Sequence, residues 1–315
     1  MTLEPYPHKL VILMIEKETM MSTQKEIETR KKLQAIQMSI GTAAFLAVFK
    51  VSVGFLTHSL GLIASAVDSL MDVLVSSVNL IAAKEADKPA DREHLYGHGK
   101  IESLAGLFQS LVISASGLFL VVESIRRLIH GVELTYLKTA IGVMVLSMVL
   151  TFFLVLRLKK ALKETGSIIV GTEMLHFTVD FLTNGSVIFA LILVRVTGSS
   201  FWDLGIAFAI ACYILSQSFG ILKKSIDELL DRALPREEQK EIEQIILSYD
   251  PRIVGFHNLR TRKIGRQRFI DFHFEIRGEE NFARAHELAE ALIKEIRERF
   301  PGADVTVHFD PEGGE

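Results

Sequence analysis

Cysteine is nearly absent from this chain of 315 residues, which has one, Cys212, inside an apolar run. A single cysteine excludes a disulfide within the chain and disfavours a cysteine-based metal site. The chain also lacks a clear excess of positive or negative charge. The formal net charge is −3, which does not indicate a nucleic-acid partner.

The N-terminal stretch lacks the pattern of a cleavable signal peptide. Its apolar piece, residues 10–15, is short and is followed by acidic residues. We therefore expect residues 1–35 to form an N-terminal extension, and Met20 or Met21 is an alternative start.

Long apolar runs are what the sequence has in abundance. Hydrophobic residues make up 49% of the chain, and the mean hydropathy is +0.31. A helix of about 20 apolar residues crosses a bilayer, so the sequence predicts an α-helical polytopic membrane domain over residues 36–223, embedded in lipid. The six predicted transmembrane helices are residues 37–57, 61–83, 104–126, 138–157, 168–195 and 201–222.

Lysine and arginine in the short loops predict the orientation. They gather before the first span, in the second and fourth loops and after the last span, whereas the third loop is an exception. By the positive-inside rule both termini are cytoplasmic. We expect a multi-pass protein of the inner (cell) membrane.

Residues 224–315 differ in character, because they are charged and their apolar runs are short. A helical pattern after Pro235 is followed by two alternating stretches, "RIVGFHNLRTRKIG" and "RFIDFHFEI", with a tight turn at Gly265. Residues 281–299 have helical periodicity, and "ADVTVHFD" reads as a last strand. The order αββαβ predicts a cytoplasmic α+β domain.

Acidic residues interrupt two of the apolar spans. Asp68 and Asp72 lie four residues apart in "ASAVDSLMDV", and His176 and Asp180 repeat that spacing in "EMLHFTVDFLTN". Residues at i and i+4 share a helix face, so two helices can present three carboxylates and one imidazole to each other. That ligand set suits a tetrahedral divalent ion, with zinc the first candidate.

A structural hydrogen bond is the simpler explanation for one intramembrane acid. Four ionisable groups in two pairs are hard to explain that way, because each is costly within a bilayer. The same groups bind protons when a metal leaves. The pattern therefore indicates exchange of metal for protons.

The sequence resembles the cation diffusion facilitator family over about residues 35–310. The resemblance is carried, in order along the chain, by "SAVDSLMD", "HLYGHGKIESLAG", "HFTVDFLTN" and "LLDRALP". It implies a homodimeric six-span metal–proton antiporter with a cytoplasmic metallochaperone-like domain, and it implies that the two pairs of intramembrane ligands form the transport site. The His-Asp pair is similar to the zinc and cadmium branch; Fe²⁺, Co²⁺ and Mn²⁺ stay open as substrates.

The resemblance also implies two further metal sites and a dimer contact. Asp91, His94 and His98 match a site in the loop between the second and third spans, for which the alternative is a loop with incidental histidines. Lys100 and Asp231 match residues that interlock at the membrane–cytoplasm junction. The matching ligands of two zinc ions in the cytoplasmic domain are His257, His273, His286, His308 and Asp310.

Three other classes of function remain as alternatives. A metal-gated channel would conduct without proton coupling, and a membrane-tethered sensor would leave the intramembrane acids unexplained. An intramembrane zinc protease would need an H-E-x-x-H motif, which the sequence lacks.

Overall fold

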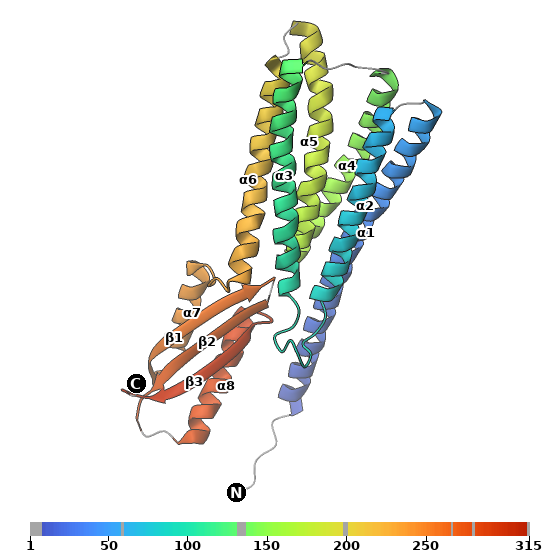
Figure 1. Cartoon of the computed structure of the whole chain (residues 1–315). Helices are drawn as coiled ribbons and strands as arrows, with labels where there is room; N and C mark the ends of the chain where they lie inside the picture. The colour runs from blue at the N-terminus through green and yellow to red at the C-terminus, as the bar shows by residue number, and fades with distance from the viewer. Residues whose placement is uncertain are drawn as a thin grey trace. The chain divides into compact units, whose positions relative to one another are not determined.

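The computed structural model describes residues 8–57, 60–130, 137–197, 201–265, 267–278 and 281–313. The chain divides into two compact units, Met1–Ile226 and Asp227–Glu315. Long helices build the first unit and a small sheet with helices builds the second (Figure 1). The predicted fold class, a helical membrane domain followed by an αββαβ domain, is confirmed.

Six long helices occupy the six predicted spans. Within the described residues, the segments Glu26–Leu56, Ser65–Ala86, Lys100–Val122 and Ile141–Thr165 are long and apolar enough to cross a membrane. That the fifth and sixth helices also cross stays a prediction. The helices are α1 (His8–Leu56), α2 (Leu60–Ala86), α3 (Lys100–His130), α4 (Leu137–Thr165), α5 (Ile168–Thr197) and α6 (Phe201–Leu229).

Helix α5 stands between α1, α2 and α4 on one side and α3 and α6 on the other (Figure 1). Phe177 of α5 is buried against Leu154 and Leu158 of α4. Leu175 of α5 belongs to a second cluster with Ile113 of α3 and Ile214 of α6. Packing on both flanks fixes the rotation of α5 and so the direction of its polar residues.

The N-terminal part of the chain is more regular than expected. Much of the stretch expected as an extension, from His8 onward, is continuous with the first span in α1. Lys32 of α1 is 5% exposed. Its Nζ lies 2.6 Å from Asp87 Oδ1 and 3.2 Å from Glu102 Oε2. A buried lysine requires such partners, and this ion-pair triad joins the middle of α1 to the end of α2 and the start of α3.

The second unit contains a three-stranded sheet in the order β1-β2-β3. Strands β1 and β2 are antiparallel, and β2 and β3 are parallel. The predicted turn at Gly265 has a positive φ of 59°. Pro235 precedes α7 as its N-cap. The elements are α7 (Arg236–Tyr249), β1 (Ile253–Ile264), β2 (Gln267–Ile276), α8 (Phe282–Arg299) and β3 (Asp304–Pro311).

Alternation along β2 assigns its two faces. Ile270, Phe272 and Phe274 are buried in a core shared with α7 and α8. Because successive residues of a strand point to opposite faces, His273 and Glu275 lie on the face away from this core. His273, one of the histidines expected to bind metal, therefore lies on the open face of the sheet.

Candidate metal centre

Asp72 of α2 meets His176 and Asp180 of α5 inside the first unit. Each of the three offers a ligand atom within 4.8 Å of the others. His176 Nε2 is 3.0 Å from Asp72 Oδ1 and 3.8 Å from Asp180 Oδ2. Phe177 presents its ring edge-on to His176, with 5.2 Å between the ring centroids. Two carboxylates and an imidazole at these distances can hold a divalent cation or protons.

Asp68 does not belong to this three-residue group. It lies one helical turn before Asp72, and its side chain is exposed. Its place as a fourth ligand stays a prediction.

A polar stripe on α2 runs through the centre. Its members recur at intervals of four and three residues, which keeps them on one helix face. Ser69, Ser76 and Asn79 are buried. The stripe comprises Ser65, Ser69, Asp72, Ser76 and Asn79.

The stripe continues past Asp72 into a buried hydrogen-bond network around Glu173, which lies one turn before His176 on α5. The Glu173 side chain is 0% exposed. Its carboxylate accepts a hydrogen bond of 2.6 Å from Asn79 Nδ2 and one of 3.0 Å from Ser76 Oγ. Asn79 Nδ2 also donates to Gln109 Oε1 of α3 at 2.6 Å. The network links α2, α3 and α5 beside the metal centre.

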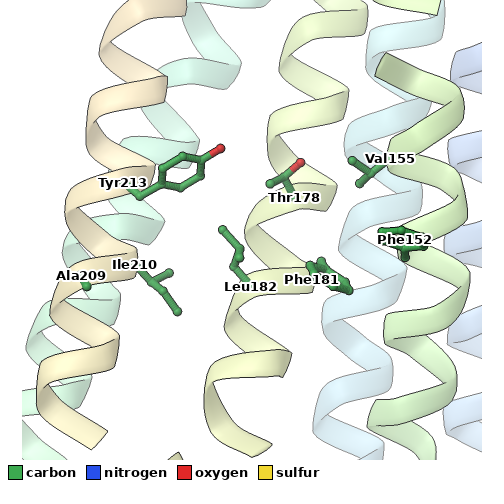
Figure 2. A pocket seen from close by; sticks show the side chains of 8 residues that line it. All are labelled: Phe152, Val155, Thr178, Phe181, Leu182, Ala209, Ile210 and Tyr213. Carbon is green, nitrogen blue, oxygen red and sulfur yellow. The ribbon is translucent and has the colours of Figure 1, made fainter. Parts of the chain in front are cut away.

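The opposite side of α5 lines an apolar pocket instead of the metal centre. Thr178, Phe181 and Leu182 line an apolar pocket of about 470 Å³ together with residues of α4 and α6 (Figure 2). Because residues 176 and 178 are about 200° apart around a helix, this pocket is separate from the metal centre. Its lining has few polar atoms, and we assign it no ligand.

The loop after α2 brings Asp91, His94 and His98 together, again within 4.8 Å. Asp91 Oδ1 accepts backbone hydrogen bonds from His94 at 2.7 Å and Glu93 at 2.9 Å. These bonds, the first being the stronger, hold the pKa of Asp91 below its usual value. His98 Nε2 lies 3.3 Å from Asp91 Oδ2. The ionised carboxylate and two imidazoles form a three-ligand group in which Asp91 and His94 are exposed and His98 is partly buried.

Sheet register produces the third group. His257 of β1 pairs with His273 of β2, which pairs with His308 of β3. Asp310 Oδ2 is 3.0 Å from His273 Nδ1 and 3.3 Å from His257 Nε2. Asp310 Oδ1 is 2.9 Å from His308 Nδ1. One carboxylate thus contacts three imidazoles across three strands.

The electrostatics of Asp310 follow from those contacts. Desolvation opposes its ionisation, but the hydrogen bond with His273 and the neighbouring histidines outweigh that effect and lower its pKa. His286 lies apart from the group on α8, exposed and stacked on Phe282 with 6.4 Å between the ring centroids.

Lys100 and Asp231 lie in different units. Lys100 is the first residue of α3. Asp231 follows α6 with a positive φ of 54°, and Arg262 Nη1 lies 3.3 Å from its Oδ1. The interlock between them stays a prediction.

Sequence reasoning missed several polar residues near the metal centre, namely Lys50 on α1 and the network partners of Glu173. The signal was present: a lysine within the first span, and serines and an asparagine at the spacing of one helix face. Such residues in apolar spans merit the same attention as acids.

Comparisons with known proteins identify the family of the chain. The family model for the cation efflux transmembrane domain matches residues 36–230, and the model for the cation efflux protein cytoplasmic domain matches residues 234–312. The chain is 40% identical over 269 residues to the cation-efflux pump FieF of Pectobacterium atrosepticum, covering 85% of this chain and 89% of that relative. It is 37% identical over 297 residues to FieF of Salmonella arizonae, covering 93% and 95%.

Among solved structures, the metal-bound C-terminal domain of the CzcD transporter from Thermotoga maritima is 31% identical. The match covers 26% of this chain and 98% of that one, with a TM-score of 0.24. The two domain matches together span nearly all of the chain. The chain belongs to the cation efflux (cation diffusion facilitator) family of membrane transporters.

Proposed function

We propose that this transporter exports divalent metal ions, zinc first among them, in exchange for protons. The observation that carries the proposal is the meeting of Asp72, His176 and Asp180 between two helices of an apolar bundle. Intramembrane ionisable residues mark ion pathways in transporters. Asp68 completes the proposed transport site as a fourth ligand. Fe²⁺, Co²⁺, Cd²⁺ and Mn²⁺ are further candidate substrates, because donor type alone does not separate these metals.

The proposed cycle alternates access to that site. The inward-facing state takes a metal ion from the cytoplasm, and the protein then exposes the site to the other side. Protons bind the same carboxylates and the imidazole and so displace the metal, because these ligands hold metal only when deprotonated. The inward proton gradient drives the return. We place residues 36–223 in the inner membrane, with the extension 1–35, residues 224–315 and both termini in the cytoplasm.

The other two groups are proposed as further metal sites. Asp91, His94 and His98 form a group of three ligands near the surface that is suited to modest zinc affinity. The cytoplasmic unit carries a family dimerisation domain, and its cluster of His257, His273, His308 and Asp310 fits a zinc site in donor type. We propose that zinc there, with His286 contributed at the interface, stabilises a homodimer by mass action.

Transport by reconstituted protein tests the proposal. Metal flux into proteoliposomes is measured with an imposed pH gradient for zinc, iron and manganese, with Asp68→Ala and His176→Ala alongside. We expect zinc flux that follows the pH gradient and is lost in both variants. Flux indifferent to the gradient would indicate a channel. Absence of flux together with tight zinc binding by the cytoplasmic unit would indicate a sensor.

A further inference from the structure

Lys50 is a cation inside an apolar helix. It lies within the membrane-spanning segment Glu26–Leu56 of α1, and its side chain is half-buried. A lysine at such a position carries a large desolvation cost, and in known membrane proteins it faces the bundle interior and interacts with other polar groups. Its location therefore requires an explanation.

The contacts of Lys50 direct it to the segment of α2 that carries the proposed ligands. Nζ donates to Ser69 Oγ at 2.9 Å and to the Ser65 backbone oxygen at 3.4 Å. Ser69 is buried and is the neighbour of Asp68. Asp72 follows Ser69 by one helical turn. The ammonium is thus hydrogen-bonded to Ser69 of α2, which lies between Asp68 and Asp72 in the sequence.

Lys50 is electrostatically coupled to the site without being one of its ligands. Asp72, Asp180 and Asp68 are the carboxylates that act on the ammonium. Within the described part of the chain, no carboxylate lies within 4.0 Å of it, and serine oxygens hold it. The ammonium can therefore remain in place while the carboxylates bind a metal ion.

We propose that Lys50 is a fixed counter-charge of the transport site, which weakens the hold of the site on its metal and so permits release. The inference rests on the proposed transport site. Three ionised carboxylates and one divalent ion leave one negative charge, and the ammonium neutralises it. Repulsion between the ammonium and the bound cation acts at short range in a medium of low dielectric constant. A site without Lys50 would bind divalent metal more tightly and release it more slowly.

The test separates the charge of Lys50 from its hydrogen bonds. Lys50→Met removes both, Lys50→Gln keeps a donor for Ser69 but loses the charge, and Lys50→Arg keeps the charge. Zinc binding and zinc transport are measured on the full chain in a His98→Ala, Asp310→Ala background, which disables the other two candidate sites.

We expect Lys50→Met and Lys50→Gln to bind zinc about tenfold more tightly, with KM and kcat both reduced. Lys50→Arg should resemble the parent chain. Unchanged affinity in Lys50→Gln, or equally weakened binding in all three variants, would overturn the inference and leave Lys50 as a helix anchor.

A further variant distinguishes failure of the inference from failure of the site. Asp180→Asn in the same background should abolish zinc binding. If it does so while Lys50→Gln has no effect, the counter-charge is refuted and the transport site stands. If Asp180→Asn binds zinc normally, the proposed site itself is wrong, and the inference is overturned with it.

Discussion

Asn79 is the residue whose removal most directly tests the packing beside the metal centre. Its Nδ2 donates at 2.6 Å both to Glu173 on α5 and to Gln109 on α3. Asn79→Ala deletes both bonds and leaves Glu173 with the hydrogen bond from Ser76. The variant therefore weakens the junction of three helices without touching a proposed ligand.

The size of the effect follows from these contacts. Hydrogen bonds between membrane helices contribute about 0.6 kcal/mol on average and about 1.7 kcal/mol at most. Both bonds are 2.6 Å long and buried, so each should lie between these two figures. We expect Asn79→Ala to lower the free energy of unfolding by about 2 kcal/mol.

Reversible unfolding in mixed micelles, followed by loss of helical circular dichroism, measures this difference. Ser77→Ala is a matched control, because Ser77 Oγ donates to Val73 of the same helix and its loss should change stability by less than about 0.5 kcal/mol. A double-mutant cycle with Glu173→Ala should give a coupling of about 1 kcal/mol or more. Equal stability of Asn79→Ala and Ser77→Ala, or strict additivity in the cycle, would refute the reasoning.

Two further predictions concern the second unit. Hydrogen bonds from the Arg252 side chain and backbone lower the pKa of Asp250 to about 2. This pair therefore stabilises the fold above about pH 4 and loses its contribution as the pH falls toward 2. In chemical unfolding of residues 227–315, Asp250→Asn should reduce the dependence of the unfolding free energy on pH over that range, and an unchanged pH profile would contradict this. Zinc should stabilise the unit by about 2.7 kcal/mol at one hundred times its Kd. Asp310→Ala should abolish that gain, while Asp271→Ala, on the neighbouring strand β2, should retain it. A gain that survives Asp310→Ala would exclude the cluster.

Strand alternation was sufficient to place His308 and Asp310 on one face of the last strand, because side chains alternate with a period of two. That His273 joins them depends on the register between β2 and β3. The pairing of His257 with His273 was less predictable. It depends on a register shift between His257 and Arg260, where Asn258 adopts a positive φ of 55°. A bulge of this kind depends on backbone geometry that a hydrophobic pattern does not specify.

In the membrane unit, the helix positions followed from apolar length, and the pairing of Asp72 with His176 agrees with the spacing of the two motifs. The exposed position of Asp68 did not follow, since i, i+4 spacing fixes a shared face but not the rotation of that face toward a neighbour. Likewise, the burial of Lys32 did not follow, because it depends on two carboxylates that the end of α2 and the start of α3 bring to α1. Such tertiary contacts override the local pattern.

The claim that Asp72, His176 and Asp180 carry the metal across the membrane is tested most directly by zinc flux in Asp180→Asn proteoliposomes. Thr178→Val is the matched control, because Thr178 lies on the pocket side of the same helix (Figure 2) and its hydroxyl donates within α5 to Met174. The account predicts that Asp180→Asn loses pH-driven zinc flux while Thr178→Val retains it. Flux at the parent rate in Asp180→Asn would contradict the account.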